Sequence, residues 1–236
     1  MSMKKIMMMA VAAFMATVSA NAQFEKGTWS LQPYAGGVVS SVTNVGNFDI
    51  GDGVELEKNM TVGYIIGGEA EYQFAKKFSI AAGINYTTQG CGWKDIDYWD
   101  GPIKVEVMDQ SDILGYIKVP IVANYYIFKG FAVKTGVQFG FMVTSKFYAH
   151  GKARMDVFGD GVNRDVDLFG VVDMDNQYQK FDFSIPFGVS YQFKVPITID
   201  ARYQLGLTKL NKESFPGVKD SKNSVFTLTV GYKFAL

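Results

Sequence analysis

Apolar and polar side chains alternate with a period of two over most of the chain, and this feature limits its fold more than any other. A β-strand places successive side chains on opposite faces, so the alternation predicts strands with one apolar and one polar face. The first stretch is weaker because it contains Pro33, Gly36 and Gly37. The predicted strands cover residues 29–41, 62–74, 78–87, 116–127, 131–143, 181–193, 197–207 and 226–234.

The two faces of these strands differ in charge and in size. No charged residue falls on the apolar face, whereas the other face carries many of the strand glycines and eight charged residues: Glu69, Glu71, Lys118, Lys134, Asp182, Asp200, Arg202 and Lys233. The interior of an eight-stranded barrel is narrow, so it cannot hold the many Phe, Tyr, Ile and Leu residues of the apolar face. We therefore expect an all-β fold, an eight-stranded antiparallel up-and-down transmembrane β-barrel with its apolar face towards lipid.

The predicted connections alternate in length. Three are short, at residues 75–77, 128–130 and 194–196, and four are long, near 42–59, 90–113, 148–179 and 209–222. Outer-membrane barrels have short periplasmic turns and long extracellular loops. Aromatic residues are expected to mark the two interfaces: Phe74, Phe78, Tyr125, Phe131, Phe193 and Phe234 at the short-turn end, and Tyr86, Phe147, Phe181 and Phe226 at the long-loop end.

The N-terminal residues 1–22 match a signal peptide. Lys4 and Lys5 precede an apolar run over 6–18, and Ala20-Asn21-Ala22 provides an A-x-A cleavage site. This run is too short for a helix that spans ~30 Å of hydrocarbon. We expect cleavage after Ala22, one barrel domain over 23–236, and a location in the outer membrane of a Gram-negative cell envelope.

The composition excludes several function classes. The chain has 23 basic and 23 acidic residues, so it lacks the basic excess of a nucleic-acid-binding protein. It has one Cys and one His in 236 residues, which excludes a disulfide framework and His-rich metal sites. We predict no cofactor and no nucleic-acid partner.

Two single residues invite a chemical role. His150 is a candidate catalytic base, but no nucleophile follows it at short spacing, and we interpret it as an exposed loop histidine. Cys91, at the outer end of the third predicted strand, either pairs between chains or stays free, and we favour a free thiol. No catalytic residue is assigned.

The long connections are rich in aspartate. Their spacing does not fit a calcium-binding loop, so solvated turns are favoured over a calcium site, and no metal ligand is assigned. The residues concerned are Asp49, Asp52, Asp95, Asp97, Asp100, Asp156, Asp160, Asp173 and Asp175.

The charges of the polar face are balanced, with four acidic and four basic residues. An open pore is often lined with an excess of one sign, so balance favours a salt-bridged interior, with a narrow gated channel as the alternative. Arg202 is expected to reach the carboxylates around Asp200 and the Glu69/Glu71 pair, because charges in a low-dielectric interior must be paired.

Four motifs resemble those of the PorT-like outer-membrane β-barrel domain family. They are Ala201-Arg202-Tyr203-Gln204-Leu205-Gly206-Leu207-Thr208, Tyr116-Ile117-Lys118-Val119-Pro120, Phe181-Asp182-Phe183-Ser184 and the ending Gly231-Tyr232-Lys233-Phe234. The resemblance covers nearly the whole predicted mature chain and implies a porin-like barrel fold.

These features together predict a non-enzymatic outer-membrane barrel with a structural or interaction role. Its expected partners are outer-membrane lipid and a protein at the extracellular loops or the periplasmic face. A component of a secretion system or a narrow small-solute channel is the alternative, and a lipid-modifying enzyme is disfavoured by the missing catalytic set.

Overall fold

The structure is a computed structural model, and it describes residues 25–45, 48–49, 55–100, 103–155, 164–174, 177–212 and 218–236. The predicted signal peptide and its cleavage site lie outside these residues. Among the described residues, no helix is long and apolar enough to cross a membrane.

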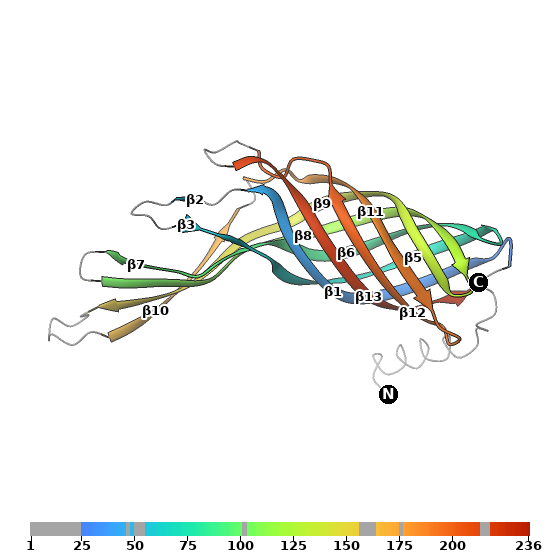
Figure 1. The fold of residues 1–236 in the computed structure, drawn as a ribbon, viewed down its shortest axis with the longest axis horizontal. Helices are drawn as coiled ribbons and strands as arrows, with labels where there is room; N and C mark the ends of the chain where they lie inside the picture. Colours follow the sequence, from blue (N-terminus) through green and yellow to red (C-terminus); the bar gives the residue numbers. More distant parts are fainter. Residues whose placement is uncertain are drawn as a thin grey trace, which may run out of the picture.

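Eight long antiparallel strands form a closed ring (Figure 1). Around the ring they pair in the order β1-β5-β6-β8-β9-β11-β12-β13 and back to β1. Their bounds are Trp29–Val45 (β1), Thr61–Ala75 (β5), Phe78–Trp93 (β6), Ile103–Phe128 (β8), Phe131–Met155 (β9), Phe181–Gln192 (β11), Ile197–Gly206 (β12) and Val218–Tyr232 (β13). The predicted eight-stranded barrel is confirmed.

Short strands lie outside this ring. β7 (Ile96–Asp100) pairs with β8, and β10 (Arg164–Asp173) pairs with β9. β4 (Lys58–Asn59) pairs with β6, β14 (Phe234–Ala235) pairs with β1, and β2 (Phe48–Asp49) pairs with β3 (Glu55–Leu56). β7, β8, β9 and β10 together form an antiparallel sheet that projects beyond one end of the barrel, hereafter the protruding sheet (Figure 1).

The protruding sheet corrects the expectation of long loops at 90–113 and 148–179. Much of both stretches is strand, because β6 runs to Trp93, β8 begins at Ile103 and β9 runs to Met155. Strand pairing gives partners to backbone groups that a long loop would have to satisfy in other ways. His150 accordingly lies on β9 and not in a loop.

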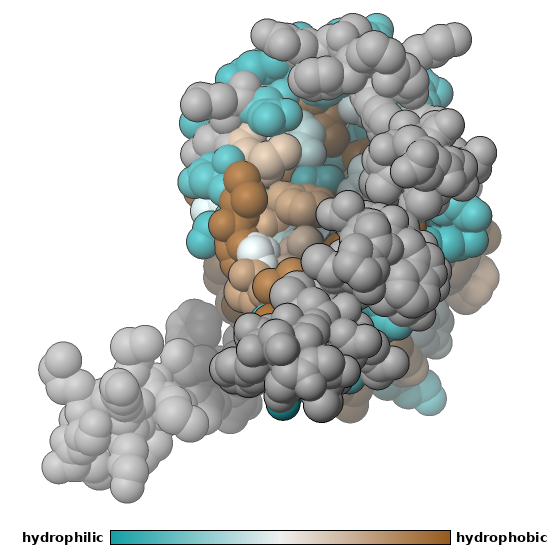
Figure 2. Space-filling view, turned by 90° about the vertical axis from the view of Figure 1, so that its left-hand side faces the viewer, coloured by the Kyte–Doolittle hydropathy of each residue, from teal (hydrophilic) through white to brown (hydrophobic). Residues whose placement is uncertain are grey.

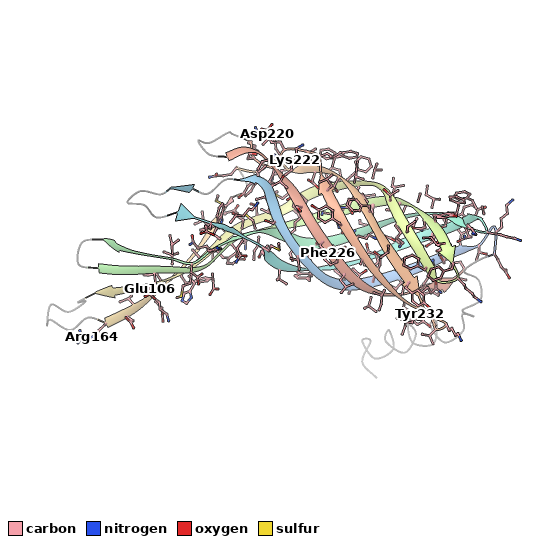
Figure 3. All side chains as sticks on the ribbon, in the orientation of Figure 1. Glu106, Arg164, Asp220, Lys222, Phe226 and Tyr232 are labelled. Carbon is pink, nitrogen blue, oxygen red and sulfur yellow. The ribbon has the colours of Figure 1, made fainter. Side chains whose placement is uncertain are left out.

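The two faces of the barrel wall are assigned correctly by the alternation in all eight strands. Outward residues such as Val62 (78% exposed), Ile84 (60%) and Val230 (56%) form an apolar exterior, as does the labelled Phe226 in Figure 3. Inward residues are buried and mostly polar. The glycines of the inner face allow close strand contact: a Cβ at Gly136 would lie 2.0 Å from the Ile121 carbonyl oxygen, and one at Gly188 would lie 2.1 Å from that of Ala201.

Aromatic rings contact one another at the short-turn end, as predicted. The ring centroids of Phe78 and Tyr125 are 4.9 Å apart, and those of Phe74 and Phe78 are 6.2 Å apart. Phe147 at the other end is a correction, because β9 carries one extra residue, Val143, opposite the Gly115–Tyr116 step of β8. This bulge shifts the alternation by one position, so Phe147 lies on the same face as the buried Asp112 and not on the lipid face.

Candidate functional site

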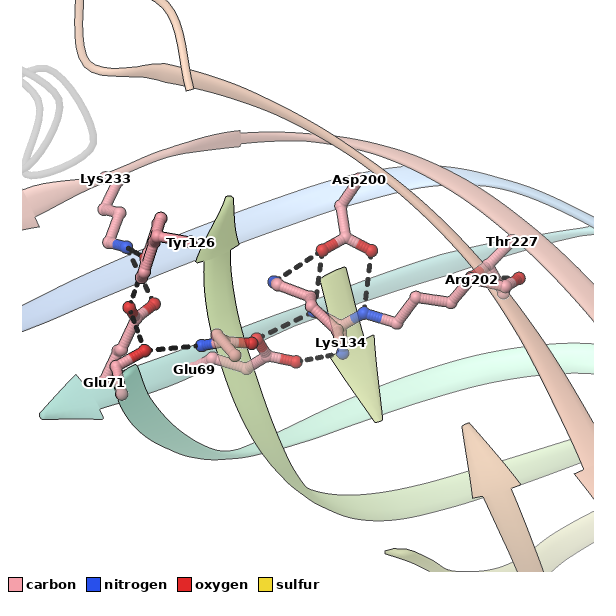
Figure 4. Close-up of polar contacts among 10 residues, drawn as sticks. Glu69, Glu71, Tyr126, Lys134, Asp200, Arg202, Thr227 and Lys233 are labelled. Atoms are coloured by element: carbon pink, nitrogen blue, oxygen red, sulfur yellow. Dashed lines mark hydrogen bonds and ion pairs between the residues drawn. The ribbon is translucent and has the colours of Figure 1, made fainter. Parts of the chain in front are cut away.

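The end of the lumen near the short turns is filled by a buried cluster around Glu71 (Figure 4). Lys233 Nζ lies 2.7 Å from Glu71 Oε2, and Ser79 Oγ donates to Glu71 Oε1 at 2.6 Å. Tyr126 Oη donates to the same Oε1 atom and accepts a hydrogen bond from Lys233 Nζ at 3.1 Å. Three other strands or strand ends thus provide partners to the one carboxylate of Glu71.

A second cluster lies next to the first and is centred on Arg202. The guanidinium donates to both Asp200 oxygens, at 2.7 and 3.0 Å, and to both Glu69 oxygens, one of them at 2.9 Å. Lys134 Nζ lies 2.6 Å from Asp200 Oδ2. The predicted reach of Arg202 to Glu69 is confirmed, and the bidentate geometry is the strongest that an arginine offers to a carboxylate.

These two clusters give the lumen its main electrostatic character. Each of their six charged residues is at most 8% exposed and lies beside an opposite charge: Glu69, Glu71, Lys134, Asp200, Arg202 and Lys233. Charges held in a low-dielectric interior are costly unless they are paired. The arrangement is that of a barrel filled by its own side chains, as expected from the balanced charges.

Lys118 and Asp182 depart from the predicted pairing. Lys118 Nζ donates to Gln89 Oε1 at 2.5 Å and to Gln204 Oε1 at 2.7 Å, and among the described residues it makes no ion pair. Asp182 instead accepts from Asn223 Nδ2 at 3.0 Å and from Thr208 Oγ1 at 3.2 Å. This level of the lumen is therefore held by amide and hydroxyl groups, a feature that a charge count does not reveal.

The mouth of the barrel, at the end from which the sheet protrudes, is closed by an apolar cluster that the sequence analysis missed. Its buried members are Val42, Cys91, Leu114, Tyr116, Met142 and Leu210, with Trp93 and Tyr178 packed against them. They come from β1, β6, β8, β9 and two connections, so no local pattern joins them. The cluster blocks the lumen with side chains above the ion-paired levels.

Asp112 is buried within this cluster. Tyr178 Oη donates to its Oδ1 at 3.0 Å, and Trp93 Nε1 and the Cys91 thiol lie 3.4 and 3.7 Å from its Oδ2. Asp112 on β8 lies opposite Cys91 on β6 in the strand register. Cys91 is buried, and the free thiol favoured above stays a prediction.

The protruding sheet has two unlike faces, which the strand registers define. Its outer face continues the outside of the barrel and is rich in charge, with Glu106, Lys152 and Asp167 in one row across β8, β9 and β10. Its inner face continues the lumen side and is apolar along β10 and its neighbours, including Val107, Gly151, Leu168, Phe147 and Val172. Figure 2 views the molecule from this end and shows hydrophobic side chains beside hydrophilic ones.

The other candidate residues are not gathered into a chemical site. His150 has Met108 and Phe169 as its cross-strand partners, and its Nε2 lies 3.9 Å from the exposed Asp167 carboxylate. Among the described residues, no group of three His, Cys, Asp or Glu side chains is placed to hold a metal ion. Of the aspartates considered above, Asp52, Asp156, Asp160 and Asp175 lie outside the described part of the chain.

Solved structures similar to this chain include bacterial outer-membrane proteins. The attachment invasion locus protein Ail of Yersinia pestis is 17% identical, with 89% of this chain and all of that one covered (100%) at a TM-score of 0.40. OprG of Pseudomonas aeruginosa is 11% identical over 91% and 98% of the two chains, at a TM-score of 0.38. Neisserial surface protein A is 17% identical over 87% and 97%, at 0.34.

No curated protein matches the chain. A family model described as an outer membrane protein beta-barrel domain matches residues 21–212, which includes most of the strand ring and the protruding sheet. The PorT-like assignment within such barrels stays a prediction. The closed eight-stranded ring, its apolar exterior and this match agree, and the chain belongs to the outer membrane protein beta-barrel domain family.

Proposed function

We propose that this outer-membrane protein is a non-enzymatic interaction protein, with the protruding sheet as its contact surface for a partner outside the cell. The observation that carries the proposal is the contrast between a filled lumen and an exposed sheet. The lumen is occupied by ion pairs and closed by the apolar cluster at its mouth. The sheet instead presents exposed side chains, among them Phe169 (72%) and Val172 (54%).

Two further parts of the proposal concern export and chemistry. Residues 1–22 act as a signal peptide that is cleaved after Ala22, which mass spectrometry of the mature N-terminus tests. The protein performs no catalysis, because His150 has Met108 and Phe169 as its cross-strand neighbours and neither provides a nucleophile.

Conductance in planar bilayers tests the filled lumen. The folded protein should give no stable single-channel steps, because each buried charge in the two clusters lies within 2.9 Å of an opposite charge. Reproducible conductance that responds to Arg202→Met would overturn the proposal and favour the narrow-channel alternative.

A truncation tests the sheet. Replacing residues 97–106 and 150–169 by Asn-Gly turns would reconnect the register pairs Ile96/Val107 and Ala149/Gly170 and remove most of the sheet. The truncated barrel should still fold into vesicles and show heat-modified migration on gels, but cells that carry it should lose attachment to the extracellular partner. Unchanged attachment would contradict the proposed role of the sheet.

A further inference from the structure

Strand β10 is an open edge of the protruding sheet. Among the described residues it pairs with β9 alone, and its ten residues, Arg164–Asp173, leave one side of the strand without a neighbouring strand. The backbone groups of a strand point alternately to its two sides, so alternate residues of β10 present their N–H and C=O groups away from β9. Such an edge is a template for the addition of another strand.

The two faces of β10 differ in chemistry. One face carries Asp165, Asp167, Phe169, Val171 and Asp173, and Asp167 is 74% exposed in its side chain. The other face is mainly apolar, with Leu168 at 47% and Val172 at 54% exposed. An added strand would therefore meet an acidic and aromatic row on one face and an aliphatic row on the other.

The pairing of β10 with β9 shows which sequence fits it. β9 places Lys152 opposite Asp167, Lys146 opposite Asp173, and Ala149 and Phe147 opposite Gly170 and Val172. A strand on the free side meets the same two rows. Resting on the proposed interaction role, we propose that β10 binds an extended polypeptide segment in which basic residues alternate with apolar ones, added as a further antiparallel strand.

A second copy of this chain fits the edge less well. Two-fold pairing of β10 with itself places the acidic face of one copy beside that of the other, with Asp165 opposite Asp173 when Phe169 is at the centre. Like charges opposite each other destabilise a strand pair. The acidic row thus disfavours self-association and favours a basic partner.

The test uses a probe that already has the required pattern. It is a labelled synthetic peptide with the sequence of residues 145–155, added to the full-length mature protein in lipid nanodiscs and followed by fluorescence anisotropy. The peptide should bind, and a version with Lys146, Lys152 and Arg154 replaced by Glu should bind at least about tenfold more weakly, as expected from two or three cross-strand ion pairs. Equal binding of the two peptides, or binding by neither, would overturn the proposal.

Backbone pairing is tested by methylation of the peptide amides. Two peptides are made, N-methylated on alternate residues in the two possible phases. One phase removes the donors that face β10 and should abolish binding, whereas the other should change the affinity by less than about twofold, because its amides face away. Equal affinity of both methylated peptides would show that the contact is not strand addition.

A matched pair of protein variants locates the contact. Asp167→Asn should weaken peptide binding severalfold, whereas Asp220→Asn should leave it unchanged, because Asp220 is another exposed carboxylate (64% against 74% for Asp167) but lies outside the sheet. Equal effects of the two variants would indicate general charge attraction and contradict the proposed site. Absent peptide binding in a barrel that does not conduct overturns only this inference, whereas conductance overturns the proposed function itself.

Discussion

β8 and β9 run through both the barrel wall and the protruding sheet, and the two regions use the same alternation in opposite phase. In the wall, Phe141 of β9 faces lipid at 51% exposure and Gln138 points into the lumen at 2%. Above the bulge at Val143, Lys146 is on the outer side and Phe147 on the inner side. The outside of the same strand thus changes from apolar to charged where the surroundings change from lipid to water.

This comparison shows that a single bulge allows one strand to turn apolar side chains outward in the wall and charged side chains outward in the sheet. A second bulge, between Met108 and Ser111 of β8, lies further along the same strand pair, opposite Tyr148–His150, and Asp109 there has a φ of 50°. Without the extra residues, strict alternation would carry the lipid-facing phase into the sheet. The environment dictates residue type strongly in the wall and weakly in the sheet. Substitutions in the wall should therefore change stability more than substitutions in the sheet.

The largest effect is expected in the lumen. Arg202→Met leaves Glu69 without its cation and Asp200 with Lys134 only. Breaking a buried ion pair from one side costs about 3–5 kcal/mol, so the free energy of unfolding in vesicles should fall by about that amount. The double variant Glu69→Gln with Arg202→Met should recover part of the loss.

A double-mutant cycle on urea unfolding isolates the Arg202–Glu69 contact. A coupling energy near zero would mean that the two side chains do not depend on each other. In that case the lumen would be more hydrated than a filled interior, and the conductance experiment would become decisive.

The second effect concerns the lipid-facing side of β9. Val137 lies opposite Ile121 in the middle of the wall, and Val137→Arg places a charge in hydrocarbon at a cost of about 2–4 kcal/mol. The inward control is Gln138→Glu, since Gln138 contacts Gln204, which also accepts from Lys118. Folding yields in vesicles should be lower for Val137→Arg. The reverse order would show that the register of β9 is wrong.

The wall could be predicted from the sequence because its signal is local. Each strand from residue 62 onwards shows its two faces within a few positions, and lipid on one side makes the alternation strict. The ion pairs of Arg202 were predictable in part, because closure of the ring brings together inward-facing charges that lie at the same level along the barrel axis. Lys118 shows the limit, since its partners Gln89 and Gln204 depend on strand stagger that no short pattern encodes.

The mouth and the sheet could not be predicted for a different reason. Bulges add one residue without a distinctive sequence, so Phe147, which is expected to mark the interface, lies on the inner face instead. The apolar cluster at the mouth joins residues as distant as Val42 and Leu210. Strands that extend into water tolerate polar residues on either face, so the stretches near 96–107 and 146–173 lack the lipid-imposed contrast and resemble loops.

A smaller effect is expected when the same kind of substitution is made in the sheet. Val171 is 45% exposed and lies on the outer face, as Val137 does in the wall, but under the proposed function this part of the sheet stands in water. Val171→Arg should change the free energy of unfolding by no more than about 0.5 kcal/mol, as is usual for exposed positions. A loss near that of Val137→Arg would indicate that this part of the sheet is embedded in lipid, which would end the distinction between the two regions.

The smallest effect is expected at Asp167, and it makes the sharpest contrast between the regions. Its carboxylate is 74% exposed and lies 3.9 Å from His150 Nε2, whereas Asp200 is 2% exposed and binds both Lys134 and Arg202. An exposed pair of this kind contributes little, because water and salt screen it. Asp167→Ala should therefore alter unfolding by less than about 0.5 kcal/mol, while Asp200→Ala should destabilise the barrel by several times more, because it leaves two buried cations short of a carboxylate. Urea unfolding of both variants at low and at high salt gives the comparison. If Asp167→Ala were as destabilising as Asp200→Ala, the sheet would be a structural part of the barrel, and the acidic row of β10 would owe its presence to stability and not to a partner.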